Sequence, residues 1–106
     1  MESKYLTVFV TAPSVEDGSQ IARILVKEKL AACVNILPGI TSIYTWNSEI
    51  CEDSEVLLII KTRIDLFEAL SATVQKEHPY DVPEVIALPL ATGASNYLDW
   101  IDKVTR

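Results

Sequence analysis

The segment from residue 78 to residue 84 gathers the side chains that are best suited to bind a ligand. It holds the only histidine of the chain, His78, followed by Tyr80, Asp81 and Glu84, with two prolines among them. A neutral imidazole beside carboxylates can bind a divalent transition metal ion. The prolines stiffen the segment, so it can present these side chains from a fixed frame. The spacing therefore makes His78, Asp81 and Glu84 candidate metal ligands, with Tyr80 next to them.

The same residues are also compatible with a purely structural role. A histidine in the last turn of a helix is favoured by the helix dipole, and a proline directly after it ends the helix. Tyr80 can be a core aromatic residue with a satisfied hydroxyl, while Asp81 and Glu84 can be solvated. On spacing alone, the ligand site and the structural helix end both stay open.

Motifs for catalysis are weaker. The sequence has no glycine-rich phosphate loop, and one histidine allows no Ser-His-Asp set to be argued from spacing. We therefore expect a protein that is not an enzyme and that requires no cofactor. Asp53 and Glu55 on the hairpin are expected to form a solvated acidic rim. Together with Glu49 and Glu52 they are also expected to attract cations with low specificity.

The composition narrows the class of protein. A chain of 106 residues is the size of one domain, which we expect to span residues 1–106. Its hydrophobic content of 49% and its three glycines are unlike those of disordered or fibrous chains. Fifteen acids against nine bases give a net charge of −6, so nucleic acid is a poor partner, because phosphates need a basic patch.

The apolar runs are too short for a membrane segment. The longest, 30–34 and 56–60, fall far below the roughly 20 residues of a spanning helix. The first residues lack the basic start, apolar run and small-residue cleavage site of a signal peptide. We therefore expect no membrane insertion and a cytoplasmic location.

Alternating strand and helix patterns surround the candidate segment and must position it. Runs of β-branched and aromatic residues predict strands at 6–11, 31–46, 49–62 and 84–90, the second of them kinked at Pro38-Gly39. Apolar residues at helical spacing predict helices from residue 15 to about Leu30, from about Asp65 to Glu77, and over 96–105. Ser14 with Asp17 resembles a capping box, and Asp65 is the expected cap of the second helix.

The order β-α-β-β-α-β plus a terminal helix predicts an α+β fold of the ferredoxin-like, split βαβ type. We expect an antiparallel sheet with both main helices on one face, and a long hairpin that turns at Asn47-Ser48. With a two-residue turn there, Tyr44 faces Cys51 and Thr62 faces Cys33. The two cysteines therefore do not face each other, so we expect no disulfide between them and a buried thiol at Cys33.

The predicted strands are apolar on both faces, although two helices can cover only one face. In the strand over 49–62, Val56, Leu58 and Ile60 alternate with Leu57 and Ile59. An antiparallel sheet with one wet face should alternate more cleanly. The hairpin strands, at about 14 residues, exceed the usual length and offer edges for pairing. We therefore expect a symmetric oligomer; the alternative is a long hairpin packed on its own domain.

Several stretches together resemble one known family, in the same order and over nearly the whole chain. They are VTAP at 10–13, LAACVN at 30–35, PGITSIYTW at 38–46, IKT at 60–62, HPYDVPE at 78–84 and YLDW at 97–100. The set is similar to the CutA family of divalent-cation tolerance proteins. The resemblance implies a ferredoxin-like subunit in a homotrimer similar to the PII signalling proteins, and a cytoplasmic role in tolerance to divalent metals, copper above all.

The resemblance also suggests site residues. Metal sites proposed in the family use a cysteine just before Thr-Ala-Pro, the histidine of His-Pro-Tyr and the glutamate of Pro-Glu. The last two match His78 and Glu84, whereas Val10 stands at the position of the cysteine. Two other functions stay open: a PII-like sensor of a small molecule, and a non-catalytic trimeric scaffold in which Tyr44 and Trp46, near the hairpin tip, serve assembly.

Overall fold

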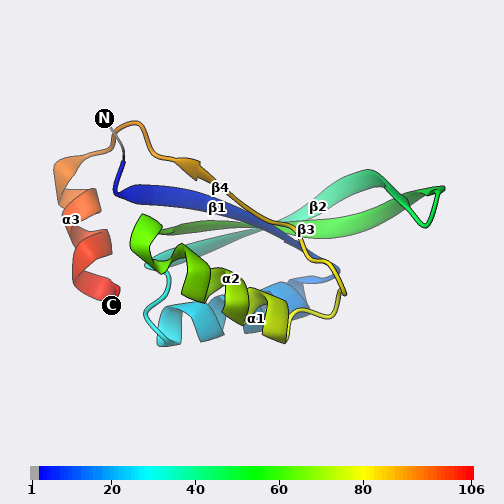
Figure 1. Cartoon of the computed structure of the whole chain (residues 1–106), viewed down its shortest axis with the longest axis horizontal. Helices are drawn as coiled ribbons and strands as arrows, with labels where there is room; N and C mark the ends of the chain where they lie inside the picture. The colour runs from blue at the N-terminus through cyan, green and yellow to red at the C-terminus, as the bar shows by residue number, and fades with distance from the viewer. Residues whose placement is uncertain (1–2) are drawn as a thin grey trace.

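Four antiparallel strands form one sheet, and two helices cover one of its faces (Figure 1). The structure is a computed structural model, and it describes residues 3–106. In chain order the elements are β1 (Tyr5–Ala12), α1 (Val15–Lys27), β2 (Cys33–Trp46), β3 (Glu49–Arg63), the short 3₁₀ helix η1 (Ile64–Leu66), α2 (Phe67–Glu77), β4 (Val85–Pro89) and α3 (Ser95–Val104). The strand order in the sheet is β2-β3-β1-β4. The predicted mixed α+β fold and its sequence of elements are confirmed.

The core lies between the sheet and the two helices. In β1, every second side chain is buried, from Leu6 to Ala12. β3 contributes Val56, Leu58 and Ile60 to the same layer. The helices close it with residues on their inner stripes, namely Ile21, Leu25, Leu70 and Val74, which are at most 2% exposed. Burying one such side chain stabilises the fold by about 1.5–3 kcal/mol, so this layer is what holds α1 and α2 on the sheet.

α1 begins as predicted and ends earlier than predicted. The Ser14 hydroxyl oxygen accepts a hydrogen bond from the Asp17 N–H at 3.1 Å and donates to the Asp17 carboxylate at 3.0 Å. The predicted end at Leu30 is wrong, because the helix ends at Lys27 and Lys29 turns into the left-handed region at φ 60°. The Leu30 N–H then bonds back to the Leu25 carbonyl at 2.9 Å. The reversal places Leu30 in the core instead of at a helix end.

The start of α2 also differs from the prediction. Asp65 is not its cap, since η1 precedes the helix and the Asp65 carboxylate instead faces the guanidinium of Arg63. The Arg63 Nε and Nη2 atoms lie 2.9 and 3.1 Å from the two carboxylate oxygens. This pairing holds the pKa of Asp65 below its usual value. The Asp65 side chain therefore pairs with Arg63, two residues away, instead of capping α2.

The β2–β3 hairpin projects beyond the rest of the molecule and turns at Asn47-Ser48, as predicted (Figure 1). Both turn residues have positive φ, 51° and 63°, the combination of a type I′ turn. Tyr44 faces Cys51, which confirms the predicted register near the tip. Farther down, the prediction that Thr62 faces Cys33 is wrong, because Cys33 faces Lys61. Both cysteines are free, and Cys33 is half-buried, not buried as expected.

A β-bulge at Pro38-Gly39 causes this shift. Leu37 pairs with Leu57 and Ile40 pairs with Glu55, so two residues of β2 stand opposite one residue of β3. Gly39 has φ 80°, a left-handed conformation that suits glycine. Because side chains alternate along a strand, one extra residue exchanges the two faces of everything beyond it.

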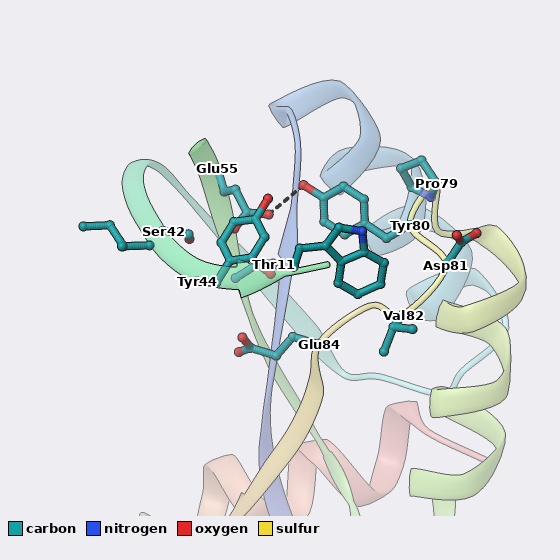
Figure 2. A pocket seen from close by; sticks show the side chains of 11 residues that line it. Thr11, Ser42, Tyr44, Glu55, Pro79, Tyr80, Asp81, Val82 and Glu84 are labelled. Carbon is teal, nitrogen blue, oxygen red and sulfur yellow. Dashed lines mark hydrogen bonds between the residues drawn. The ribbon is translucent and has the colours of Figure 1, made fainter. Parts of the chain in front are cut away.

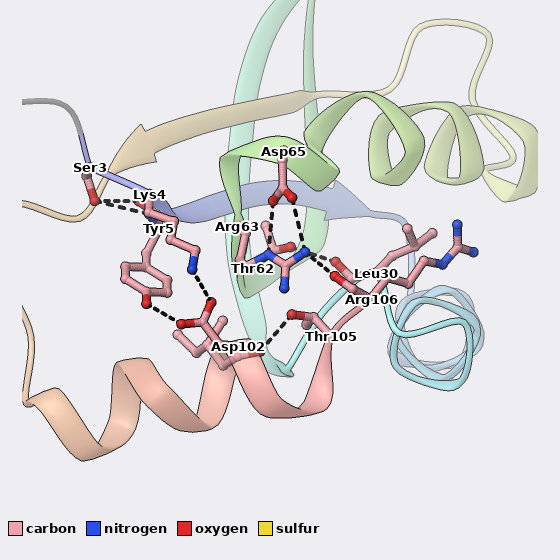
Figure 3. A network of polar contacts seen from close by, with 11 residues as sticks. Ser3, Lys4, Tyr5, Leu30, Thr62, Arg63, Asp65, Asp102, Thr105 and Arg106 are labelled. Atoms are coloured by element: carbon pink, nitrogen blue, oxygen red, sulfur yellow. Dashed lines mark hydrogen bonds and ion pairs between the residues drawn. The ribbon is translucent and has the colours of Figure 1, made fainter.

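α3 covers one end of the second face of the sheet. Its Ile101 is fully buried, and the Tyr5 hydroxyl donates to the Asp102 carboxylate at 2.6 Å (Figure 3). The Lys4 ammonium lies 2.9 Å from the other carboxylate oxygen. The β4 part of this face stays uncovered: Ile86 is 55% exposed and Leu88 is 53% exposed.

Within residues 3–106, no helix has both the length and the apolar character that crossing a membrane requires.

The turn offers a direct test of the hairpin geometry. A Ser48→Gly substitution is expected to raise the free energy of unfolding by about 0.5–1 kcal/mol, since glycine adopts positive φ without the steric cost that serine carries. Urea denaturation at a fixed protein concentration measures the change. Ser54→Gly is the matched control, because Ser54 is an exposed residue of extended β3 where glycine should destabilise. A destabilised Ser48→Gly variant would contradict the turn type.

Candidate functional site

A cleft of about 620 Å³ lies between the hairpin and the segment that leads into β4 (Figure 2). β2 and β3 supply one wall, and the residues after α2 supply the other. The lining residues are Thr11, Ser42, Ile43, Tyr44, Trp46, Glu55, Pro79, Tyr80, Asp81, Val82 and Glu84. Five of the six predicted site residues therefore line one cleft, and the sixth, His78, is not among them.

The β2 bulge explains why these hairpin residues meet. Before the bulge, the even-numbered Ile36 pairs with Leu58, which belongs to the core layer. After it, even-numbered positions such as Ser42 and Tyr44 fall on the face of Glu55, opposite that layer. The extra residue thus turns a hydroxyl and aromatic rings toward the carboxylate.

Glu55 is the buried acid of the cleft. It is only 7% exposed, and its Oε2 accepts a hydrogen bond of 2.7 Å from the Tyr80 hydroxyl. The expectation that it belongs to a solvated acidic rim is wrong for this residue. A signal was present in the sequence, because Glu55 shares its strand face with Leu57 and Ile59, so its carboxylate extends an apolar stripe.

Two tyrosine hydroxyls hold carboxylates at the cleft. Burial, followed by the hydrogen bond to Glu55, raises the pKa of Tyr80 far above its usual value. The hydrogen bond to Asp53 is the main cause that raises the pKa of Tyr44 to about 12. Both phenols therefore keep their protons at neutral pH and act as donors. The two pairs tie the carboxylate side chains in place.

His78 serves as a structural link behind the cleft. It is 7% exposed, and its Nε2 lies 2.7 Å from the Thr11 carbonyl oxygen, which can only accept. Its Nδ1 accepts from the Tyr80 N–H at 3.1 Å. These two contacts fit the tautomer with its proton on Nε2, and the ring centroid lies 4.7 Å from that of Tyr80. A metal ion could bind this histidine only after one of the two hydrogen bonds broke.

The remaining candidates do not complete a metal site within one chain. Asp81 and Glu84 line the cleft, whereas Val10, where the resemblance suggested a cysteine ligand, is buried in the core with no exposed surface. Within residues 3–106, no three histidine, cysteine, aspartate or glutamate side chains form a group that could hold a metal ion. What the arrangement does supply is a cavity of small-molecule size with aromatic and acidic walls.

Comparisons with known proteins agree with the fold. A family model described as CutA1 divalent ion tolerance protein matches residues 6–104. The "Divalent-cation tolerance protein CutA" of Thermus thermophilus is 52% identical over 98 residues, which are 92% of this chain and 95% of that protein. "Protein CutA, chloroplastic" of Arabidopsis thaliana is 54% identical over 101 residues, 95% of this chain and 56% of that protein. This chain thus spans about half the length of the plant relative.

Solved structures of such proteins are also similar. The structure of the divalent cation tolerance protein (Cut A1) from Thermus thermophilus superposes with a TM-score of 0.94 at 50% identity, covering 96% of this chain and 99% of that one. The crystal structure of CutA1 from Oryza sativa gives a TM-score of 0.95 at 50% identity, covering 99% of this chain and 96% of that one. The four-stranded sheet and its helices therefore match those in solved structures of CutA1 proteins.

The Tyr80–Glu55 hydrogen bond should contribute measurably to stability. A Tyr80→Phe substitution is expected to lower the free energy of unfolding by about 1–2 kcal/mol, because it leaves a buried carboxylate without its donor; the partial exposure of Tyr80 keeps the loss in the lower part of the range. Urea denaturation at pH 7 measures it. Tyr44→Phe makes the same chemical change at an exposed pair and should have little effect. Equal losses in the two variants would argue against the burial of Glu55.

Proposed function

Because the chain belongs to the CutA1 divalent ion tolerance family, we propose that it acts in divalent ion tolerance as a homotrimer whose cleft binds a small molecule. The observation that carries this proposal is the cleft itself, whose hairpin and loop walls are joined by the Tyr80–Glu55 hydrogen bond. The protein is then a non-catalytic, PII-like sensor that requires no cofactor. Such a protein would confer tolerance to metals either by signalling that they are present or by binding the small molecule in its cleft.

The uncovered face of the sheet supports the trimer. Ile86 and Leu88 are about half exposed on β4, although they extend from a strand whose other face meets the core. Apolar area of this kind on a sheet is typical of a subunit interface. β2 and β4 are also the edge strands, which can pair with neighbouring chains. In this proposal, ferredoxin-like subunits assemble in a PII-like trimer.

The two cysteines do not require an oxidising compartment, because they do not face each other in the hairpin. Cys33 and Cys51 are both free thiols on β2 and β3, and disulfides form mainly in oxidising compartments. We therefore propose that the protein works in the cytoplasm.

Direct metal binding is the second candidate function. Three carboxylates, those of Glu55, Asp81 and Glu84, line the same cleft, but within residues 3–106 they do not converge as one ligand group, so a divalent ion would need further oxygen ligands from water. Copper prefers imidazole nitrogen or thiolate sulfur, which would require the ring of His78 to leave Thr11 and Tyr80. The intact hydrogen bonds of that ring are the reason to rank copper binding second.

A charge on the uncovered face should break the assembly. Ile86→Glu is expected to convert a trimer into monomers, because a carboxylate would be buried in the apolar interface without a partner. Sedimentation equilibrium gives the mass directly. Val15→Glu is the matched control, since Val15 is 49% exposed in the first turn of α1, where an acid is favoured. A wild-type protein that sediments as a monomer would refute the proposed trimer.

A copper titration should separate the two candidate functions. Calorimetry with copper(II) is expected to show weak binding that is equal in the wild-type protein and in a His78→Gln variant. Glutamine keeps one donor and one acceptor at this buried position, which favours correct folding. The comparison requires that the variant has the same melting temperature as the wild-type protein. Micromolar binding that is lost in the variant would instead establish His78 as a metal ligand and favour the second candidate.

A further inference from the structure

We propose that the cleft selects a small organic cation, an ammonium or guanidinium group carried on a compact apolar body. This inference rests on the proposed function, because it names the chemical class of ligand for the same cleft. Three features of the cleft lead to it: the balance of charge, the buried carboxylate and the aromatic walls.

The charge on the lining is one-sided. Glu55, Asp81 and Glu84 contribute three carboxylates, whereas none of the lining residues, all within the described part of the chain, is lysine, arginine or histidine. The chain as a whole carries a net charge of −6. A concave surface with one sign of charge concentrates ligands of the opposite sign. An anionic ligand would meet repulsion here and no positively charged partner among the lining residues.

The carboxylate of Glu55 makes the attraction stronger and more local. At 7% exposure it is largely removed from water, and the Tyr80 hydroxyl is a neutral donor that leaves its charge uncompensated. Among the hydrogen bonds of residues 3–106, this carboxylate uses Oε2, so Oε1 remains available to accept. A charge pair in such a site is screened less than one on the surface. A positively charged group in the cleft therefore supplies the opposite charge that the lining residues lack.

The aromatic walls specify an organic cation in particular. In the single chain, Tyr44, Trp46 and Tyr80 expose 42%, 47% and 36% of their surfaces. Figure 2 shows that Tyr44 and Tyr80, which come from different elements, both reach toward the Glu55 carboxylate. The faces of such rings attract ammonium and guanidinium groups and also pack against apolar carbon. A neutral ligand would gain from the packing alone.

A bare metal ion does not use these features. The cleft of about 620 Å³ is far larger than an ion with its ligands needs. No group of three possible metal-ligating side chains converges within residues 3–106. Aromatic rings, moreover, do not supply the oxygen or nitrogen ligands that divalent ions prefer. Size, ring faces and a single deep carboxylate together fit a cation that carries carbon.

Three probes of nearly equal shape separate charge from size: choline, its neutral counterpart 3,3-dimethylbutan-1-ol, and the anion 3,3-dimethylbutanoate. Binding is followed by tryptophan fluorescence in a Trp100→Phe background, which leaves Trp46 as the only tryptophan. Trp100 lies on α3, at the opposite end of the molecule from the hairpin tip (Figure 1). Choline is expected to bind at least about tenfold more tightly than the alcohol, and the anion is expected not to bind.

Three variants test whether the cleft causes this preference. Glu55→Gln keeps an acceptor for Tyr80 and is expected to weaken choline binding by about tenfold while leaving the alcohol unchanged. Glu52→Gln removes the same charge from an exposed hairpin residue outside the cleft and should leave choline binding unchanged. Asp81→Asn, at an exposed loop position, keeps the test available if Glu55→Gln fails to fold; it should weaken choline binding by a smaller factor.

The outcomes separate this inference from the proposed function. Tighter or equal binding of the alcohol or the anion overturns the organic cation and leaves a small-molecule cleft. Equal losses in Glu55→Gln and Glu52→Gln overturn the assignment to the cleft. If no probe binds, the inference falls. If, in addition, metal-free thermal shift with cationic, neutral and anionic metabolites gives no gain in melting temperature, the proposed small-molecule function falls with it.

Discussion

One extra residue in β2 determines how the hairpin presents its side chains. Side chains alternate strictly along a strand, so the bulge at Pro38-Gly39 exchanges the faces of all residues between it and the turn. Below the bulge, β2 directs Val34 and Ile36 to the core. Above it, the same parity serves the cleft. One strand can therefore meet two different demands, apolar packing at its base and ligand contact in its arm, without any change in the alternation itself.

Two hydrogen bonds of neighbouring residues attach the other wall to the sheet. His78 reaches the Thr11 carbonyl at the end of β1, and Tyr80 reaches Glu55 on β3. The segment between α2 and β4 is thereby fixed to the two central strands before any ligand arrives. A wall that is already ordered loses little conformational freedom on binding, which leaves more of the contact energy for affinity. His78 and Tyr80, which suggest a metal site in the sequence, thus hold one wall of the cleft in a preformed shape.

The sequence predicts the elements of this fold well because apolar periodicity, proline and the Ser14 cap act locally. It fails where a contact that the pattern does not show competes with the expected one, whether the partner is near in the chain or far away. The bulge shifts Cys33 from Thr62 to Lys61, and Arg63 draws Asp65 away from the helix that it was expected to cap. In the site, the residues around Tyr80 could be predicted from their types. The hydrogen bonds of Glu55 to Tyr80 and of His78 Nε2 to Thr11 could not, because the two partners of each bond lie far apart in the chain.

The strand order also has a consequence for the newly made chain. β1 is central, yet its two partners are β3 and β4, so that Ala12 must wait for Val56 and Tyr5 for Arg63. At a synthesis rate of about 5–20 residues per second, roughly 50 residues take several seconds to follow. During that time an apolar strand has emerged from the ribosome with neither neighbour available. The pairing of β1 with β3 and β4 joins residues far apart in the sequence, and contacts of this kind slow the folding of a chain.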